Sequence, residues 1–325
     1  MKGKEVLLAV GMGIVLPALL FSVAEKVLPM DTAIPTEQTI ATQPIQSQTD
    51  PQSSIEMVIS VLQTDGTTQR MELEDYLVGV VLGEMPLEFD IEALKAQAVV
   101  ARTYTLRRVI VSPKHDGGAV CVNSACCQSY CPPEQFAGNK LLLNKAISAV
   151  AATTGQVVTY NGALIEATYF SCSGGRTEDA QAVWGEDIPY LQSVDSPGEE
   201  NAAHYTESVC FTGEEFVNLL GIPLSGDPST WFGTVTYTAG GGVDSIRIGG
   251  VSFKGTQLRQ MLDIRSTAFT ITPRGDSILI VTKGFGHRVG MSQYGAEAMA
   301  VAGSNYRQIL SHYYPGTELT NRNQN

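Results

Sequence analysis

An uncharged, strongly apolar run near the N-terminus constrains this chain more than any other feature. Residues 6–24 (VLLAVGMGIVLPALLFSVA) carry no charge, and the run is close to the roughly 20 residues with which a helix spans a bilayer. Lys2 and Lys4 precede it, and positive residues favour the cytoplasmic side. A cleaved signal peptide is the alternative, but it requires a shorter apolar core and a clear cleavage site. We therefore expect one transmembrane helix, a single-pass location in the cell membrane, and an extracytoplasmic remainder.

The composition changes sharply after this run. Residues 31–54 (DTAIPTEQTIATQPIQSQTDPQSS) consist mainly of Thr, Gln, Pro and Ser, and such a stretch buries too little apolar surface to offset its ordering entropy. The sequence thus predicts four parts: a cytoplasmic stub and anchor at 1–24, a flexible linker at 25–55, one extracytoplasmic folded domain at 56–320, and a tail at 321–325.

The overall charge excludes one class of partner. The formal net charge is −12, which is the wrong sign for binding a nucleic-acid backbone through counterion release. Hydrophobic residues make up 43% of the 325 positions, enough to bury a sizeable core. A neutral or mixed-charge ligand fits this composition better than a nucleic acid does.

The first half of the folded part is predicted to be mainly helical. A hairpin strand at 57–62 with an Asp65-Gly66 turn precedes a helix at 73–82, which Gly83 and Pro86 should end. A second helix is predicted at 91–110, capped by Asp90, and a third at 134–152.

The second half is predicted to be rich in strands. Residues 156–160 and 163–170 flank Asn161-Gly162, the strongest short hairpin signal in the chain. Alternating segments near Val235 and Ile246 and at 277–282 continue the pattern, with a short helix at 253–262. The expected fold class is α+β, with a helical segment packed on a β-rich half and preceded by the transmembrane helix.

Glu84 lies where the first of these helices should end. Its sequence neighbours are apolar and the carbonyl end of a helix disfavours a carboxylate, so both effects should raise its pKa. A carboxyl group that stays protonated near neutral pH is what a general acid for a glycosidic oxygen requires. A Glu at a helix end is more often a solvated surface residue, so spacing alone leaves this a hypothesis.

Four cysteines and one histidine fall within residues 115–131 (HDGGAVCVNSACCQSYC). Zinc prefers thiolate and imidazole ligands of this kind. Disulfide pairing is the alternative, because an extracytoplasmic location favours it. Adjacent Cys126 and Cys127 cannot easily bond to each other without strain, which favours the metal.

Two segments rich in small residues carry hydrogen-bonding groups. Residues 171–177 (SCSGGRT) leave a strand into a tight turn, where Ser173 and backbone amides can face a sugar. Residues 284–296 (GFGHRVGMSQYGA) combine glycines, which allow close backbone approach, with His287, Ser292, Gln293 and Tyr294. Either segment can also be an ordinary structural turn.

These motifs together resemble the stage II sporulation protein D family. The resemblance rests on residues 83–86 (GEMP), 92–98 (EALKAQA), 101–104 (ARTY), 173–177 (SGGRT) and 286–296 (GHRVGMSQYGA), in this order along the chain. It extends from about Tyr76 to Tyr314, nearly the whole folded part. The family usually has Gly where this chain has Arg288, so a narrower cleft or an added cation is expected there.

The resemblance implies an activity. Members of the family are lytic transglycosylases that cleave the bond between N-acetylmuramic acid (MurNAc) and N-acetylglucosamine (GlcNAc) in peptidoglycan stripped of its stem peptides, leaving 1,6-anhydro-MurNAc ends during engulfment. A cell-wall amidase and a membrane protein of the engulfment machinery are the partners it implies.

The resemblance also implies roles for individual residues. Glu84 is the catalytic residue, acting first as acid and then as base. Zinc is implied at His115, Cys121 and Cys127, as a structural ion. The candidates for binding the sugar's acetamido and hydroxyl groups are Tyr169, Ser173, His287 and Gln293, with Ser292 and Tyr294 beside them. Arg102 or Lys283 is expected to bind the lactyl carboxylate.

Two other functions fit the same sequence. A zinc amidase would use the His115 and cysteine cluster as a catalytic metal site, although thiolate-rich sites are more often structural. A wall-binding activator of an amidase would have no chemistry of its own. The nature of the sugar products distinguishes these alternatives.

Overall fold

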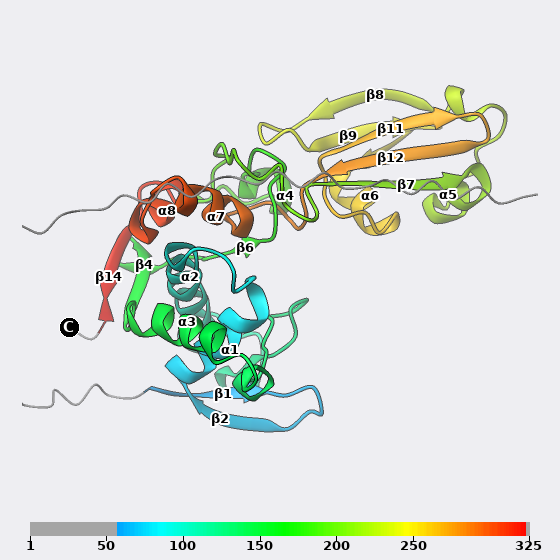
Figure 1. Cartoon of the computed structure of the whole chain (residues 1–325). Helices are drawn as coiled ribbons and strands as arrows, with labels where there is room; N and C mark the ends of the chain where they lie inside the picture. The colour runs from blue at the N-terminus through cyan, green and yellow to red at the C-terminus, as the bar shows by residue number, and fades with distance from the viewer. Residues whose placement is uncertain (1–56, 323–325) are drawn as a thin grey trace, which may run out of the picture. The chain divides into compact units, whose positions relative to one another are not determined.

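The computed structural model describes residues 57–322, which belong to one compact unit (Figure 1). Within this unit the buried apolar side chains form two separate hydrophobic cores. The predicted linker at 25–55 and residues 323–325 of the predicted tail lie outside the described residues.

A short hairpin and a helix begin the described chain, as predicted. Strand β1 (Val58–Leu62) pairs antiparallel with β2 (Thr68–Glu72) around a turn in which Asp65 Oδ1 accepts from the Thr67 amide at 2.9 Å. Helix α1 (Leu73–Glu84) follows directly and buries most of its length. Strand β3 (Val120–Cys121) adds to β1 in parallel, so the cysteine segment is attached to this hairpin.

Helix α2 (Ile91–Ile110) is the centre of the first core. Asp90 caps it by accepting from the Glu92 amide at 2.8 Å, as the sequence predicts. The helices that pack around it are α1, α3 (Lys140–Ala151), α7 (Gln293–Val301) and α8 (Tyr306–Tyr313). The helix predicted at 134–152 is interrupted: a 3₁₀ turn at Pro133–Phe136 comes first, and Asn139 then caps α3 as a new helix.

The predicted strand at 163–170 is also interrupted. Strand β4 (Gln156–Tyr160) pairs with β5 (Ala163–Leu164) and β14 (Glu318–Asn321), and Asn161 and Gly162 turn with positive φ. The chain then leaves this sheet, because the Glu166 amide donates to the Tyr190 hydroxyl instead of a strand. Strand β6 (Tyr169–Phe170) pairs in parallel with β13 (Met291–Ser292), which brings together two segments far apart in sequence.

Residues 206–283 form the second core around two three-stranded antiparallel sheets. The strand orders are β11-β12-β7 and β10-β9-β8, and helices α5 and α6 pack with them (Figure 1). Their bounds are β7 (Thr206–Thr212), α5 (Gly213–Leu220), β8 (Phe232–Tyr237), β9 (Val243–Ile248), β10 (Val251–Lys254), α6 (Gly255–Met261), β11 (Phe269–Arg274) and β12 (Ser277–Lys283). The strands and short helix predicted here are confirmed.

The structure is mixed α+β, as predicted, but the prediction of a transmembrane helix is corrected. Within residues 57–322 no helix is both long and apolar enough to cross a membrane. The longest, α2, has 20 residues but carries charged side chains on several turns. The predicted single-pass membrane location depended on such a helix and is corrected with it. Residues 6–24, from which both predictions came, lie outside the described residues.

Candidate active site

Glu84 is the last residue of α1. Gly79 and Gly83 of this helix let residues 129–131 approach it closely. Residues 129–131 cross the helix end so tightly that a Cβ on Gly83 would lie 2.9 Å from the Tyr130 amide nitrogen. This approach allows the Ser129 amide to donate to Glu84 Oε1 at 2.6 Å. From the other side, Gln293 Nε2 donates to Glu84 Oε2 at 3.4 Å.

The pKa of the Glu84 carboxyl is raised. Burial is the largest cause, since it disfavours the charged form. Hydrogen bonding with the Ser129 amide and with the Tyr169 and Gln293 side chains opposes the effect of burial without cancelling it. The pKa direction expected from the sequence is therefore the one the structure gives.

Glu84 faces a cavity of about 930 Å³, within the size range of small-molecule sites. Four of the residues predicted to act on substrate line it: Glu84, Tyr169, His287 and Gln293. Parallel pairing of β6 with β13 is what brings Tyr169 and Gln293 to the same wall. The Tyr169 hydroxyl donates to Gln128 Oε1 at 3.1 Å, and Gln128 in turn donates to Thr105 Oγ1, so the wall is held by a buried chain of hydrogen bonds.

His287 is held as a neutral ring. Its Nδ1 accepts from the Val289 amide at 3.1 Å, and its ring packs between Phe170 and Trp184 with centroid distances of 5.6 and 5.4 Å. Burial and the nearby Arg259 charge lower the pKa of His287 to about 4. A ring in this state is uncharged at neutral pH and unsuited to act as a general acid there.

The other predicted binding residues lie away from the cavity lining. Arg102 is buried against Glu74, with Nη2 2.6 Å from Oε2. Ser173 donates to Glu199 Oε1 at 2.9 Å, and Ser292 caps α7 by accepting from the Gly295 amide. Tyr294 packs edge-on against Phe89. In each case the side chain has a structural partner.

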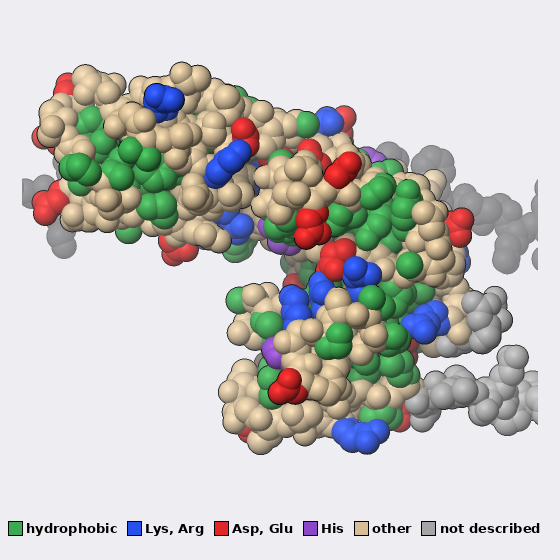
Figure 2. Space-filling view, turned by 180° about the vertical axis from the view of Figure 1, so that it is seen from behind, with side chains coloured by type: hydrophobic (Ala, Val, Ile, Leu, Met, Phe, Trp, Pro, Cys, Tyr) green, Lys and Arg blue, Asp and Glu red, His purple; other side chains and the backbone are tan. Residues whose placement is uncertain are grey.

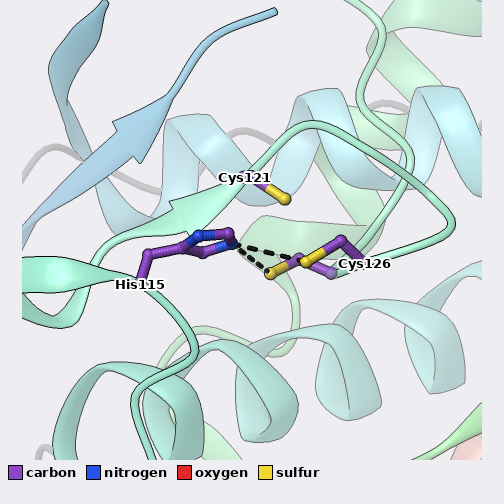
Figure 3. A group of neighbouring side chains, drawn as sticks. His115, Cys121 and Cys126 are labelled. Atoms are coloured by element: carbon purple, nitrogen blue, oxygen red, sulfur yellow. Dashed lines mark hydrogen bonds between the residues drawn. The ribbon is translucent and has the colours of Figure 1, made fainter. Parts of the chain in front are cut away.

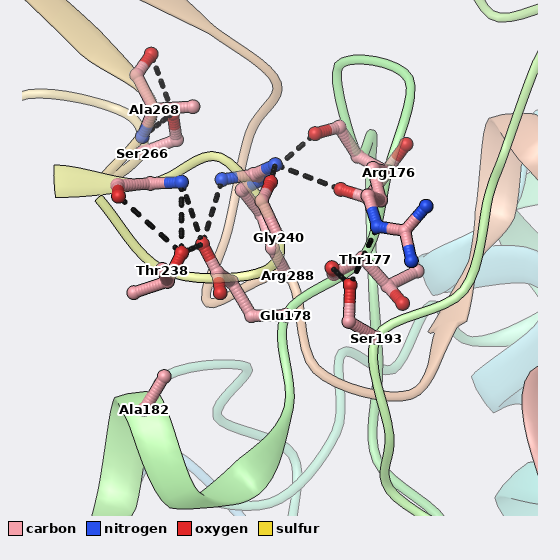
Figure 4. A network of polar contacts seen from close by, with 12 residues as sticks. Arg176, Thr177, Glu178, Ala182, Ser193, Thr238, Gly240, Ser266, Ala268 and Arg288 are labelled. Atoms are coloured by element: carbon pink, nitrogen blue, oxygen red, sulfur yellow. Dashed lines mark hydrogen bonds and ion pairs between the residues drawn. The ribbon is translucent and has the colours of Figure 1, made fainter. Parts of the chain in front are cut away.

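Arg288, which was expected to narrow the cleft or to add a cation there, does not line the cavity. Its side chain is 2% exposed, and its guanidinium donates to Glu178 Oε1 at 3.2 Å and to the carbonyl oxygens of Ser173, Arg176 and Gly240 (Figure 4). It therefore neither narrows the cleft nor places a cation beside a glycan, contrary to expectation.

The cavity is also lined by three basic side chains that were not predicted to bind a ligand: Arg107, Arg108 and Lys114. Arg107 and Arg108 both pair with Glu166, whereas Lys114 donates to the Tyr104 hydroxyl at 3.0 Å and to the Cys126 carbonyl. Among the described residues, no carboxylate pairs with Lys114. In Figure 2, basic and acidic side chains gather where this face is hollowed. Arg107 and Arg108 lie in the helix predicted at 91–110, but helical periodicity does not show which face of a helix borders a cavity.

The cysteine segment forms a compact cluster beside this cavity. The ligand atoms of His115, Cys121, Cys126 and Cys127 all lie within 4.8 Å of one another (Figure 3). His115 Nε2 is 3.5 Å from the Cys126 sulfur and 3.6 Å from the Cys127 sulfur. Cys126 was not among the predicted ligands, because the family resemblance implied only His115, Cys121 and Cys127. No disulfide joins any of the six cysteines, all of which lie among the described residues.

Comparison with known proteins identifies the family. The family model described as "SpoIID: Stage II sporulation protein" matches residues 63–160. The stage II sporulation protein D of Bacillus subtilis is 38% identical over 262 residues, covering 78% of this chain and 76% of that protein. The chain belongs to the stage II sporulation protein D family. The Bacillus amyloliquefaciens member of this sporulation family is 39% identical, with the same coverage. A B. subtilis protein named amidase enhancer is 30% identical, over 75% of this chain and 40% of its own length.

Proposed function

We propose that this protein is a peptidoglycan lytic transglycosylase that cleaves the MurNAc–GlcNAc bond, with Glu84 as its acid and base. The observation that carries the proposal is the Glu84 carboxyl itself: its pKa is raised by burial, and it faces a cavity of about 930 Å³. A carboxyl held protonated in a cavity of ligand size is the group that protonating a glycosidic oxygen requires.

The reaction uses one carboxyl group twice. Glu84 donates its proton to the glycosidic oxygen as the bond from MurNAc C1 breaks. The resulting carboxylate then accepts the proton of the MurNAc 6-hydroxyl as that oxygen bonds to C1. The products are a 1,6-anhydro-MurNAc end and a GlcNAc with a free 4-hydroxyl, and no water is consumed. Gln293 and the Ser129 amide hold the carboxyl in place through both steps.

The other carboxylates of the cavity favour this mechanism over two-carboxylate hydrolysis. Hydrolases set a second free carboxylate across the scissile bond. Here Glu166 is paired with Arg107 and Arg108, and Glu186 has an exposed side chain beyond α4 (Ala180–Trp184). Among the described residues, Glu84 is thus the one cavity carboxyl that is neither exposed nor paired with a cation.

Lys114 and Arg108, which line the cavity, favour a substrate without stem peptides. Removal of the peptide leaves the lactyl group of MurNAc as a carboxylate, and Lys114, with Arg108 beside it, offers charge in the same cavity as Glu84. We assign to Lys114 the role that was expected of Arg102 or Lys283. The Arg102 guanidinium is paired with Glu74, and Lys283 does not line the cavity. An amidase that removes the peptides is the expected partner.

Product analysis tests the proposal. Glycan strands with and without stem peptides are digested with the full-length protein and with Glu84→Gln and Glu88→Gln variants, and the ends are identified by mass spectrometry. We expect anhydromuramic ends from stripped strands, loss of at least a hundredfold in rate for Glu84→Gln, and little change for exposed Glu88→Gln. Full anhydro-product formation by Glu84→Gln would overturn the assignment.

A non-catalytic amidase activator is the second candidate, favoured by the relative named amidase enhancer. It predicts no change in glycan ends with the purified protein and faster peptide release when an amidase is added. The same digests, repeated with a peptidoglycan amidase, separate the two functions.

We also propose a structural zinc ion at His115, Cys121, Cys126 and Cys127. Ligands on one tetrahedral zinc, at about 2.3 Å for sulfur and about 2.0 Å for nitrogen, lie roughly 3.6 Å apart. The separations of 3.5 and 3.6 Å between His115 Nε2 and the sulfurs of Cys126 and Cys127 fit this geometry. Four protein ligands leave no coordination position for water, which disfavours a zinc amidase.

Metal removal tests the zinc proposal. We expect about one equivalent of zinc by elemental analysis of protein purified without chelator, and a lower Tm after chelation. Cys126→Ser should bind zinc more weakly, whereas Cys210→Ser, exposed in the second core's sheet, should not. If the purified protein contained no zinc but a disulfide between these cysteines, the zinc proposal would be wrong and a cystine would take its place.

A further inference from the structure

An exposed tryptophan stands at the edge of the cavity that contains Glu84. Trp184 lines this cavity, yet 42% of its surface is exposed. It is the last residue of α4, and Gly185 ends the helix with φ +80, so the indole projects from a helix end. An exposed indole costs hydrophobic free energy unless a ligand covers it.

The indole is held in place from behind. The imidazole of His287 packs against it at 5.4 Å between ring centroids, and Phe170 supports His287 on its other side at 5.6 Å. His287 is fixed in turn by the Val289 amide. A ring supported in this way is rigid before ligand arrives, which reduces the ordering cost of binding.

The cavity favours a flat, partly apolar ligand. Only 7% of the chain is aromatic, yet aromatic side chains line the cavity from several elements. These are Tyr104, Tyr169, Phe170, Trp184, Tyr190 and Phe285. Trp184 is the most exposed of them. One face of a pyranose presents a sheet of C–H hydrogens, which carry slight positive charge, and the face of an indole is negative.

From this arrangement we propose that Trp184 is a stacking platform for a sugar ring of the glycan strand, forming a binding subsite beside the Glu84 subsite. This inference rests on the proposed glycan substrate. The occupant is a pyranose of the same strand whose scissile bond lies at Glu84, because Trp184 and Glu84 line one cavity. His287 acts through the indole as a positioning residue.

Tryptophan fluorescence tests the subsite directly. The chain has two tryptophans, and Trp231 is buried in the second core, so it supplies a constant background. Full-length protein carrying Glu84→Gln, which prevents turnover, is titrated with peptide-free GlcNAc–MurNAc strands. We expect a saturable change in emission that is lost when Trp184→Phe is added.

Calorimetric titration of the same strands gives the affinity. In the Glu84→Gln background, Trp184→Ala should weaken binding by about tenfold or more, and Trp184→Phe by less, because a smaller aromatic face remains. Tyr237→Ala, at a residue 60% exposed on β8 and outside the cavity lining, is the matched control and should bind like its parent.

Two results would overturn the subsite: strands that bind without changing Trp184 emission, or Trp184→Ala binding as tightly as its parent. The proposed function fails separately, when wild-type protein yields no anhydromuramic ends although strands bind and quench Trp184.

Discussion

At the scale of single residues, Glu84 links stability to pH. Burial raises its pKa in the folded protein above the ordinary value for a glutamate side chain, so the folded state keeps this proton to higher pH than the unfolded state does. The group's contribution to folding is therefore most favourable below about pH 4.5 and declines as pH rises through the folded pKa.

This predicts that Glu84→Gln stabilises the protein at pH 7. The expected gain in the free energy of unfolding is on the order of 1 kcal/mol, since a carboxylate is no longer buried, and it should shrink as the pH falls towards 4.5. Urea unfolding at several pH values measures it. Glu88→Gln, at an exposed side chain, should change stability by less than about 0.5 kcal/mol at every pH.

Activity should depend on the protonation of the same Glu84 carboxyl. The rate on stripped strands should fall as pH rises through the raised pKa of Glu84, because the general acid is then lost. A rate that increases steadily with pH above neutrality would contradict a protonated Glu84 as the acid.

At the scale of elements, the contact between α1 and residues 129–131 positions the carboxyl. Gly83→Ala would place a Cβ 2.9 Å from the Tyr130 nitrogen and 3.0 Å from the Cys131 nitrogen, both backbone atoms that cannot rotate away. The crossing segment must shift, and the Ser129 amide with it. We expect a loss of about 1–3 kcal/mol in stability and at least a tenfold drop in activity, measured by urea unfolding and product release.

Gly138→Ala is the matched control for that substitution. A Cβ at Gly138 meets nothing within 4 Å, and its φ is not positive. The variant should keep wild-type activity. If Gly83→Ala behaved in the same way, the close crossing would not be needed to hold Glu84.

Several elements followed from local sequence alone. Asp90 caps α2, Asn161-Gly162 turns the hairpin, and apolar periodicity marks α1, because each depends on residues a few positions apart. Local rules failed where tertiary partners competed with them. The hairpin signal predicts one strand over residues 163–170, yet the hydrogen bond to the Tyr190 hydroxyl and the pairing with β13 divide this segment.

At the scale of the whole molecule, Arg288 and Glu178 join the segments on either side of the second core. Arg288 lies at φ +65 and binds the carbonyl oxygens of Arg176, before that core, and of Gly240, within it. The Glu178 carboxylate also accepts from Thr238 and from the Gly242 amide. A buried charge pair of this kind is costly to break, because the remaining charge has no partner.

Arg288→Met should therefore lower the free energy of unfolding by about 3–5 kcal/mol. Adding Glu178→Gln should recover part of the loss, since the amide oxygen can still accept from Thr238 and no buried charge remains. Urea unfolding of the single and double variants measures the coupling. Additive losses would show that the two side chains do not act as a pair.

The sequence by itself determined the family and most of the helices and strands. It also determined that Glu84 lies at the end of a helix and that its pKa is raised. Tertiary structure alone decided which polar residues share its cavity. Ser129 and Gln293, which hold the carboxyl, lie 45 and 209 positions away in the chain, and only the crossing at Gly83 and the parallel pairing of β6 with β13 bring them there. The structure adds three residues to the candidate site that the sequence did not predict there: Trp184, Lys114 and Cys126. It places two predicted residues, Arg102 and Ser173, outside the cavity lining. Both differences arise because sequence propensity acts over a few residues, whereas the partners of a side chain are set by packing across the core.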